Sequence, residues 1–150
     1  MDADAAQAWF IAGTVPVMLG GGLHALASLL DTVRPTFFTP VRQTVRTELE
    51  NTSIRLLPIV RSGGKAPRSM WKIWLGINIG FGLAVFMVGL SWLLIATHDY
   101  ALVESIGAIE PLTIVFSASF LVIALRYWFY GPMLIAGSAT ACFSIAAVLS

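Results

Sequence analysis

His24 is the residue of this chain best suited, by type and position, to do chemistry. It lies in the second half of the first apolar run, where an ionisable side chain is costly to keep in hydrocarbon. Asp31 follows two helical turns later on the same face, ~10 Å along the axis. Asn78 lies one turn into the second apolar run, and Arg126 ends the third. We predict that these four residues form a polar cluster near one leaflet.

Two interpretations of this cluster remain open. The first is an interhelical hydrogen bond, worth about 0.6–2 kcal/mol in a membrane. The second is a site for a small molecule, a quinone headgroup or a proton, with His24 at its centre.

Cofactor chemistry at His24 is not expected, although quinone or haem binding there stays open. A bis-histidine haem needs a second imidazole at similar depth, but His98 falls at the opposite end of the second apolar run. Only a symmetric dimer could therefore supply both ligands. Cys142 is the one cysteine, so the chain makes no intrachain disulfide and no cysteine metal cluster. No phosphate loop, zinc motif or nucleophile elbow occurs, and we predict no catalytic residues and no metal site.

The elements that must position these residues are membrane-spanning helices. Hydrophobic residues make up 57% of the chain and charged residues 11%, against roughly 45–50% and 25% in soluble domains. Helices of about 20 apolar residues cross the bilayer, because every backbone amide must be paired inside it. We predict an all-α four-helix membrane bundle in a single domain, residues 1–150, with spans at about 9–30, 73–96, 108–126 and 131–149.

The distribution of basic residues predicts the orientation. All nine lie on one side of the four predicted spans, and the positive-inside rule makes that side cytoplasmic. Both termini are then expected outside, and the first helix is expected to be retained because the segment before it, Met1 to Gln7, has no Lys or Arg. The basic residues are Arg34, Arg42, Arg46, Arg55, Arg61, Lys65, Arg68, Lys72 and Arg126.

The expected cytoplasmic loop, residues 32–70, contains an amphipathic helix pattern. Thr39 and Pro40 suit a helix start, and Pro58 suits its end. Such a helix is expected on the inner membrane surface. Residues 62–69 read as a flexible basic linker. The predicted contacts with anionic lipid headgroups are Arg42, Arg46 and Arg55.

Small residues at four-residue steps predict helix packing. Small side chains on one face let two helix backbones approach closely in lipid. Packing within the chain is favoured over packing between chains, and both remain open. The residues concerned are Gly76, Gly80 and Ala84 in the second span, and Gly137 and Ala141 in the fourth.

Several short motifs carry a resemblance to a known group of proteins. These are Leu23-His24, the pattern Trp74-x-Gly76-x-Asn78, and the segment RYWF at 126–129. Together they resemble a family of small uncharacterised four-helix bacterial inner-membrane proteins. Members often have a further histidine shortly after the asparagine, where this chain has Ile-Gly-Phe at 79–81. The resemblance implies a bacterial inner-membrane location and four helices, and it implies no activity.

Three function classes follow. A non-catalytic accessory or scaffold subunit of a larger membrane complex, such as a respiratory or photosynthetic one, is favoured. A small oligomeric transporter or channel is the alternative, and a quinone- or haem-interacting redox subunit is the second alternative. The expected partners are the lipid bilayer and other membrane subunits or further copies of the chain. The net charge of only +1 gives no reason to expect nucleic acid.

Overall fold

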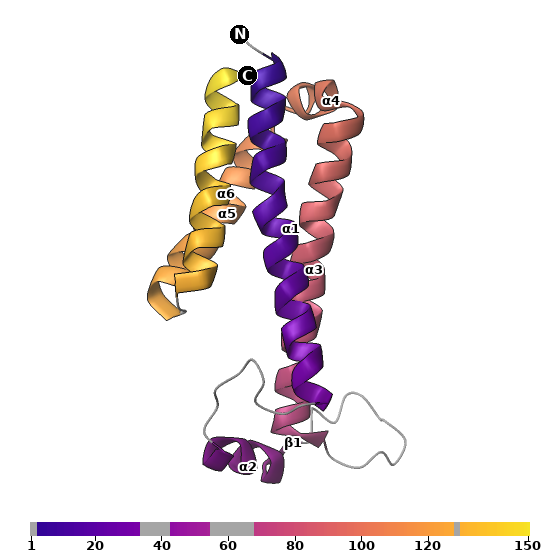
Figure 1. Cartoon of the computed structure of the whole chain (residues 1–150), viewed down its shortest axis with the longest axis vertical. Helices are drawn as coiled ribbons and strands as arrows, with labels where there is room; N and C mark the ends of the chain where they lie inside the picture. Colours follow the sequence, from indigo (N-terminus) through magenta and orange to yellow (C-terminus); the bar gives the residue numbers. More distant parts are fainter. Residues whose placement is uncertain (1–2, 34–42, 55–67, 128–129) are drawn as a thin grey trace. The chain divides into compact units, whose positions relative to one another are not determined.

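The computed structural model describes residues 3–33, 43–54, 68–127 and 130–150, which are almost entirely helical (Figure 1). Four of these helices are long and apolar enough to cross a membrane, so the chain is an all-α, multi-pass membrane protein with four spanning helices. In chain order the elements are α1 (Ala3–Val33), α2 (Gln43–Asn51), β1 (Ser53–Ile54), β2 (Arg68–Ser69), α3 (Met70–His98), α4 (Tyr100–Ser105), α5 (Ile109–Tyr127) and α6 (Tyr130–Leu149).

The first two spanning helices are longer than their apolar runs. α1 has 31 residues and α3 has 29, which corresponds to ~46 and ~43 Å at 1.5 Å per residue. A hydrocarbon core is only ~30 Å thick, so both helices continue beyond it or tilt. The predicted segments 9–30 and 73–96 therefore lie inside the observed helices. α5 and α6 agree with their predicted spans within one residue at each end.

The chain divides into two compact units. The first unit contains residues 1–22 and 83–150, and the second contains residues 23–82. α1 and α3 each contribute one segment to both units, and α4, α5 and α6 belong to the first.

Aromatic rings and alanines form the core of the first unit. Phe10 and Phe143, each 1% exposed, have ring centroids 5.2 Å apart. Trp92 contacts Phe143 edge-to-face at 5.7 Å and Phe116 at 5.3 Å. Such edge-to-face pairs match the ring quadrupoles. The alanines Ala6, Ala96, Ala139 and Ala146 are fully buried around these rings, which lets the helices pack closely.

Glycines of α3 mark the close contacts with α1 in each unit. In the first unit, a Cβ atom added at Gly89 would lie 2.6 Å from the backbone nitrogen of Met18. In the second unit, a Cβ added at Gly82 would lie 2.6 Å from the backbone nitrogen of Ala25. Real Cβ contacts are essentially never that short. Only glycine therefore fits at these two positions, seven residues apart on one face of α3.

The predicted small-residue faces differ in their contacts within the described chain, and packing between chains stays open for Gly76 and Gly80. A Cβ added at Gly76 or Gly80 would meet no atom within 4 Å among the described residues. These two glycines therefore do not mediate packing within the described chain, and Ala84 is exposed. In α6, Gly137 lies in ordinary contact with α5, 3.8 Å from the Cδ1 of Leu121, whereas Ala141 is exposed. Helical spacing alone gave no way to choose between the two faces of α3.

Two short strands pair within the connection between α1 and α3. Ser53 pairs with Ser69 and Ile54 with Arg68 in an antiparallel ladder, and the amide of Met70 donates to the carbonyl of Thr52 at 2.8 Å. The amphipathic helix therefore ends at Asn51, and the predicted end at Pro58 was wrong. The predicted flexible linker 62–69 is also wrong at its last two residues, which form β2. The predicted start at Thr39 and Pro40 lies outside the described residues.

Candidate functional site

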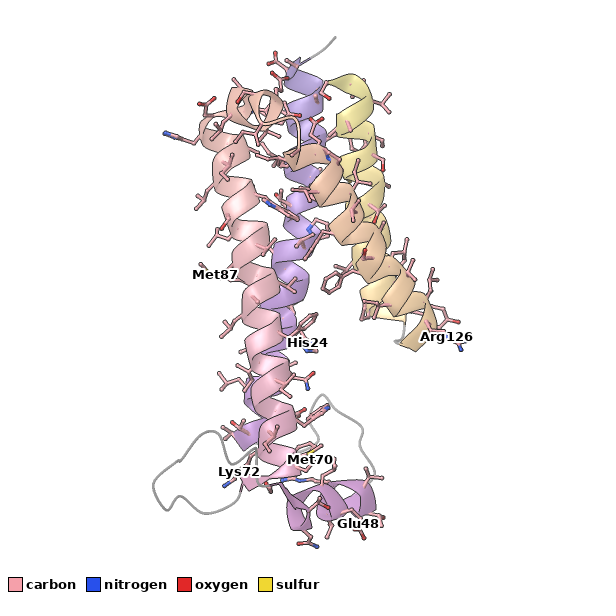
Figure 2. The ribbon with its side chains drawn as sticks, turned by 180° about the vertical axis from the view of Figure 1, so that it is seen from behind. His24, Glu48, Met70, Lys72, Met87 and Arg126 are labelled. Atoms are coloured by element: carbon pink, nitrogen blue, oxygen red, sulfur yellow. The ribbon has the colours of Figure 1, made fainter. Side chains whose placement is uncertain are left out.

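His24 and Asn78, two of the four residues of the predicted polar cluster, are in contact, and both belong to the second unit. The Nε2 atom of His24 on α1 lies 3.1 Å from the Oδ1 atom of Asn78 on α3. His24 lies nine residues before the end of α1 and Asn78 eight residues after the start of α3. Both side chains are therefore ~12–14 Å inside the ends of their helices. Figure 2 shows His24 beside α3.

The amide of Asn78 is oriented by its own helix. Its Nδ2 donates to the carbonyl oxygen of Trp74 at 2.8 Å, one turn earlier in α3. A carbonyl only accepts hydrogen bonds, so the nitrogen of the amide must face Trp74 and Oδ1 must face His24. Oδ1 is likewise only an acceptor. His24 therefore donates through Nε2–H, and a neutral ring keeps its lone pair on Nδ1.

The imidazole is also oriented by an aromatic neighbour. The Phe81 ring lies edge-to-face with the His24 ring, with centroids 5.9 Å apart and an interplanar angle of 86°. His24 is exposed at the surface of the chain, and Leu23 and Ile77 beside the pair are 62% and 65% exposed. The pair therefore lies at the surface of the described chain, and the residue before each of its members is an exposed apolar one.

The other two members of the predicted cluster, Asp31 and Arg126, belong to different units. Asp31 is only 1% exposed, seven residues beyond His24 on α1, in the second unit. Arg126 belongs to the first unit, where it is exposed in the last turn of α5. The contact the structure displays is thus the His24–Asn78 pair.

The hydrogen bond to Asn78 occupies one of the two ring nitrogens of His24. Nε2 of His24 is engaged by Asn78, so iron could bind this nitrogen only if that hydrogen bond were broken. In the described part of the chain, no three His, Cys, Asp or Glu side chains lie close enough together to hold a metal ion.

A second polar cluster, in the first unit, is not anticipated by the sequence. Glu110 lies in the first turn of α5. Its Oε1 accepts from the Tyr100 hydroxyl at 3.1 Å and its Oε2 from the Ser150 hydroxyl at 3.0 Å. Tyr100 is 8% exposed, with its ring edge-on to Phe10. The spacing of ten residues between Tyr100 and Glu110, across a turn, is the signal that could have suggested the contact.

Arg46, predicted to bind lipid headgroups, makes contacts within the second unit. Its Nε donates to Oε1 of Glu50 at 2.8 Å, and its guanidinium lies 5.2 Å from the centre of the Trp71 ring. Trp71, 5% exposed, stacks on Trp74 at 5.2 Å. These contacts hold α2 against the start of α3. Arg42 and Arg55 lie outside the described residues.

Comparison with known proteins shows no matching family model, no matching curated protein and no matching solved structure.

Proposed function

We propose that this protein is a non-catalytic accessory subunit that joins a larger membrane complex through one face of α3. The observation that carries the proposal is that no other group of the described residues lies beside Gly76 and Gly80. These residues form a Gly-x-x-x-Gly pattern in an apolar helix, the arrangement that lets two spanning helices approach closely.

The contrast within α3 supports this assignment. The backbone of Ala25 occupies the space beside Gly82, whereas a Cβ atom added at Gly76 or Gly80 would meet nothing within 4 Å in the described chain. Lipid tails contact flat and large surfaces equally well, so lipid gives no reason for glycines at two such positions. A partner helix does, because van der Waals packing against exposed backbone is the main source of helix association in membranes.

The membrane and the orientation are part of the same proposal. The distribution of all nine basic residues on one side of the spans supports a bacterial inner-membrane protein with both termini outside. The resemblance of the Leu-His and Trp-x-Gly-x-Asn motifs to four-helix bacterial inner-membrane proteins supports the same location.

Two observations make the transporter alternative weaker. α1 is continuous through Pro16 and α3 is continuous from Met70 to His98, whereas many transporter sites are built on interrupted helices. The hydroxyls of Ser117, Ser119 and Thr140 donate to carbonyls of their own helices, so these groups are already occupied.

The experiment compares complexes extracted from native membrane with a mild detergent. The wild-type particle is expected to contain other membrane subunits at fixed stoichiometry, measured by native mass spectrometry. Gly80→Ile should remove those subunits while the extracted chain keeps its helicity and thermal unfolding midpoint. Ser138→Ile, which adds a similar volume at an exposed position of α6, is the matched control and should leave the particle intact.

A particle containing only copies of this chain would contradict the accessory assignment and would favour the oligomeric transporter. An unchanged particle mass in Gly80→Ile would show that this glycine face is not the interface.

A further inference from the structure

His24 presents an unused hydrogen-bond acceptor within the apolar run of α1. Its Nε2–H is committed to Asn78, and the amide of Asn78 is held by the carbonyl of Trp74. In its neutral form the ring therefore carries its lone pair on Nδ1, and among the described residues no group donates to that atom.

An acceptor left unpaired in hydrocarbon is unfavourable. Burying a polar group without a hydrogen bond costs on the order of 1–3 kcal/mol in proteins, and lipid tails have no donor to offer. Phe81 and Asn78 hold the ring in one orientation, so the imidazole is not free to turn Nδ1 toward another partner. A molecule that enters from the bilayer and carries a donor would satisfy the atom.

We propose that Nδ1 of His24 accepts a hydrogen bond from the hydroxyl of a quinol dissolved in the bilayer. The surroundings suit a flat, largely apolar headgroup: Phe81 is 39% exposed beside the imidazole, and Ile77 and Leu23 are exposed next to the pair. The class of ligand follows from the direction of the hydrogen bond, because a quinol has hydroxyl donors and the corresponding quinone has only acceptors.

The site therefore discriminates between the two redox forms without transferring electrons. Quinol pairs with Nδ1, whereas quinone places a carbonyl oxygen against a nitrogen lone pair. We expect quinol to bind about tenfold more tightly than the matching quinone, the ratio that corresponds to one hydrogen bond. Asn78 is a positioning residue, since it selects the tautomer that makes His24 an acceptor.

The test uses the whole chain in lipid nanodiscs with ¹⁵N-labelled histidine, titrated with a short-chain benzoquinol or its benzoquinone. The nitrogen chemical shifts report which ring atom carries the proton. The quinol should move the Nδ1 signal of His24 in a saturable way, and the quinone should not. His98→Asn removes the second histidine, at the end of α3, and should leave the response unchanged.

Two variants separate the site from the scaffold. His24→Phe should abolish saturable quinol binding. Asn78→Leu removes the acceptor that fixes the tautomer of His24, so the ring can also present Nδ1–H toward the ligand. The preference for quinol over quinone should then fall from about tenfold to about twofold or less.

Equal affinity of the wild type for quinol and quinone would overturn the proposal, as would unchanged quinol binding in His24→Phe. An Nδ1 shift already typical of a hydrogen bond before any quinol is added would also overturn it, and would assign the donor to lipid or to a second protein chain. The measurement requires no partner subunit, so its failure and the failure of the accessory assignment are distinguishable.

Discussion

The phenolic hydroxyl of Tyr100 donates a hydrogen bond to the carboxylate of Glu110, with 3.1 Å between Oη and Oε1. Tyr100 begins α4 and Glu110 lies in the first turn of α5, so the bond spans the connection between two membrane helices. Ser150, after the end of α6, donates to the other carboxylate oxygen. One carboxylate thus joins three parts of the first unit.

The Tyr100 contact predicts a loss of stability at high pH. Burial, then the hydrogen bond and the charge of Glu110, and finally the charge of Glu104 raise the pKa of Tyr100 well above its ordinary value. Because the folded state favours the neutral phenol, its contribution to stability is complete below pH ~10, the ordinary value. That contribution is lost as the pH rises from there toward the folded pKa.

Thermal unfolding in detergent between pH 8 and 11 measures this effect. Tyr100→Phe should lower the midpoint at pH 8, because Glu110 loses a donor, and should reduce its decline above pH 10. Tyr130→Phe, at a side chain 81% exposed, is the control and should keep the full decline. An identical decline in all three proteins would mean that Tyr100 is not responsible.

The glycine contacts predict that replacing glycine by alanine has very different effects at two nearby positions of α3, Gly82 and Gly80. Gly82→Ala places a methyl group within 3 Å of the backbone of Ala25, so α1 and α3 must separate in the second unit. We expect a loss of about 2 kcal/mol in the free energy of unfolding, typical of an overpacked contact. Gly80→Ala meets nothing in the described chain and should change it by less than about 0.5 kcal/mol. Reversible unfolding in mixed micelles measures both, and equal effects would argue against the glycine contact.

The aromatic core of the first unit predicts a moderate cavity effect. Phe143→Ala removes a ring that is 1% exposed and contacts Phe10 and Trp92. In soluble cores such a change costs about 3–5 kcal/mol, but part of that is transfer from water. Lipid is as apolar as the core, so only the packing part applies and we expect about 2 kcal/mol. Leu134→Ala, at a position 73% exposed, is the control and should be nearly neutral.

The Arg46–Trp71 contact predicts how α2 is held. Arg46→Lys keeps the charge but loses the planar guanidinium over the indole, so backbone amide exchange in 43–51 should speed up about three- to fivefold, the equivalent of ~0.5–1 kcal/mol. Glu50→Gln breaks the ion pair while leaving the ring contact, and should have a smaller effect because exposed pairs contribute little. If Glu50→Gln exceeds Arg46→Lys, the ion pair and not the ring contact holds the helix.

The sequence alone was enough to predict the features that depend on whether a segment lies in lipid or in water. Long apolar runs without charge can only form hydrogen-bonded helices in lipid, so the four spanning helices follow from composition and length. The existence of α2 follows in the same way from amphipathic spacing. The contact of His24 with Asn78 could also be anticipated, because two polar groups at similar depth on neighbouring helices tend to pair.

Only the tertiary structure decided which faces meet. Gly76 and Gly80 carry a clearer small-residue pattern than Gly82 and Gly89, yet the latter pair contacts α1, because the helix rotation is set by the packing of all side chains and not by one motif. The pairing of Ser53 and Ile54 with Arg68 and Ser69 joins residues far apart in sequence, and no local pattern encodes it. The tautomer of His24 was likewise invisible in sequence, because it depends on the amide direction of Asn78, which the carbonyl of Trp74 determines.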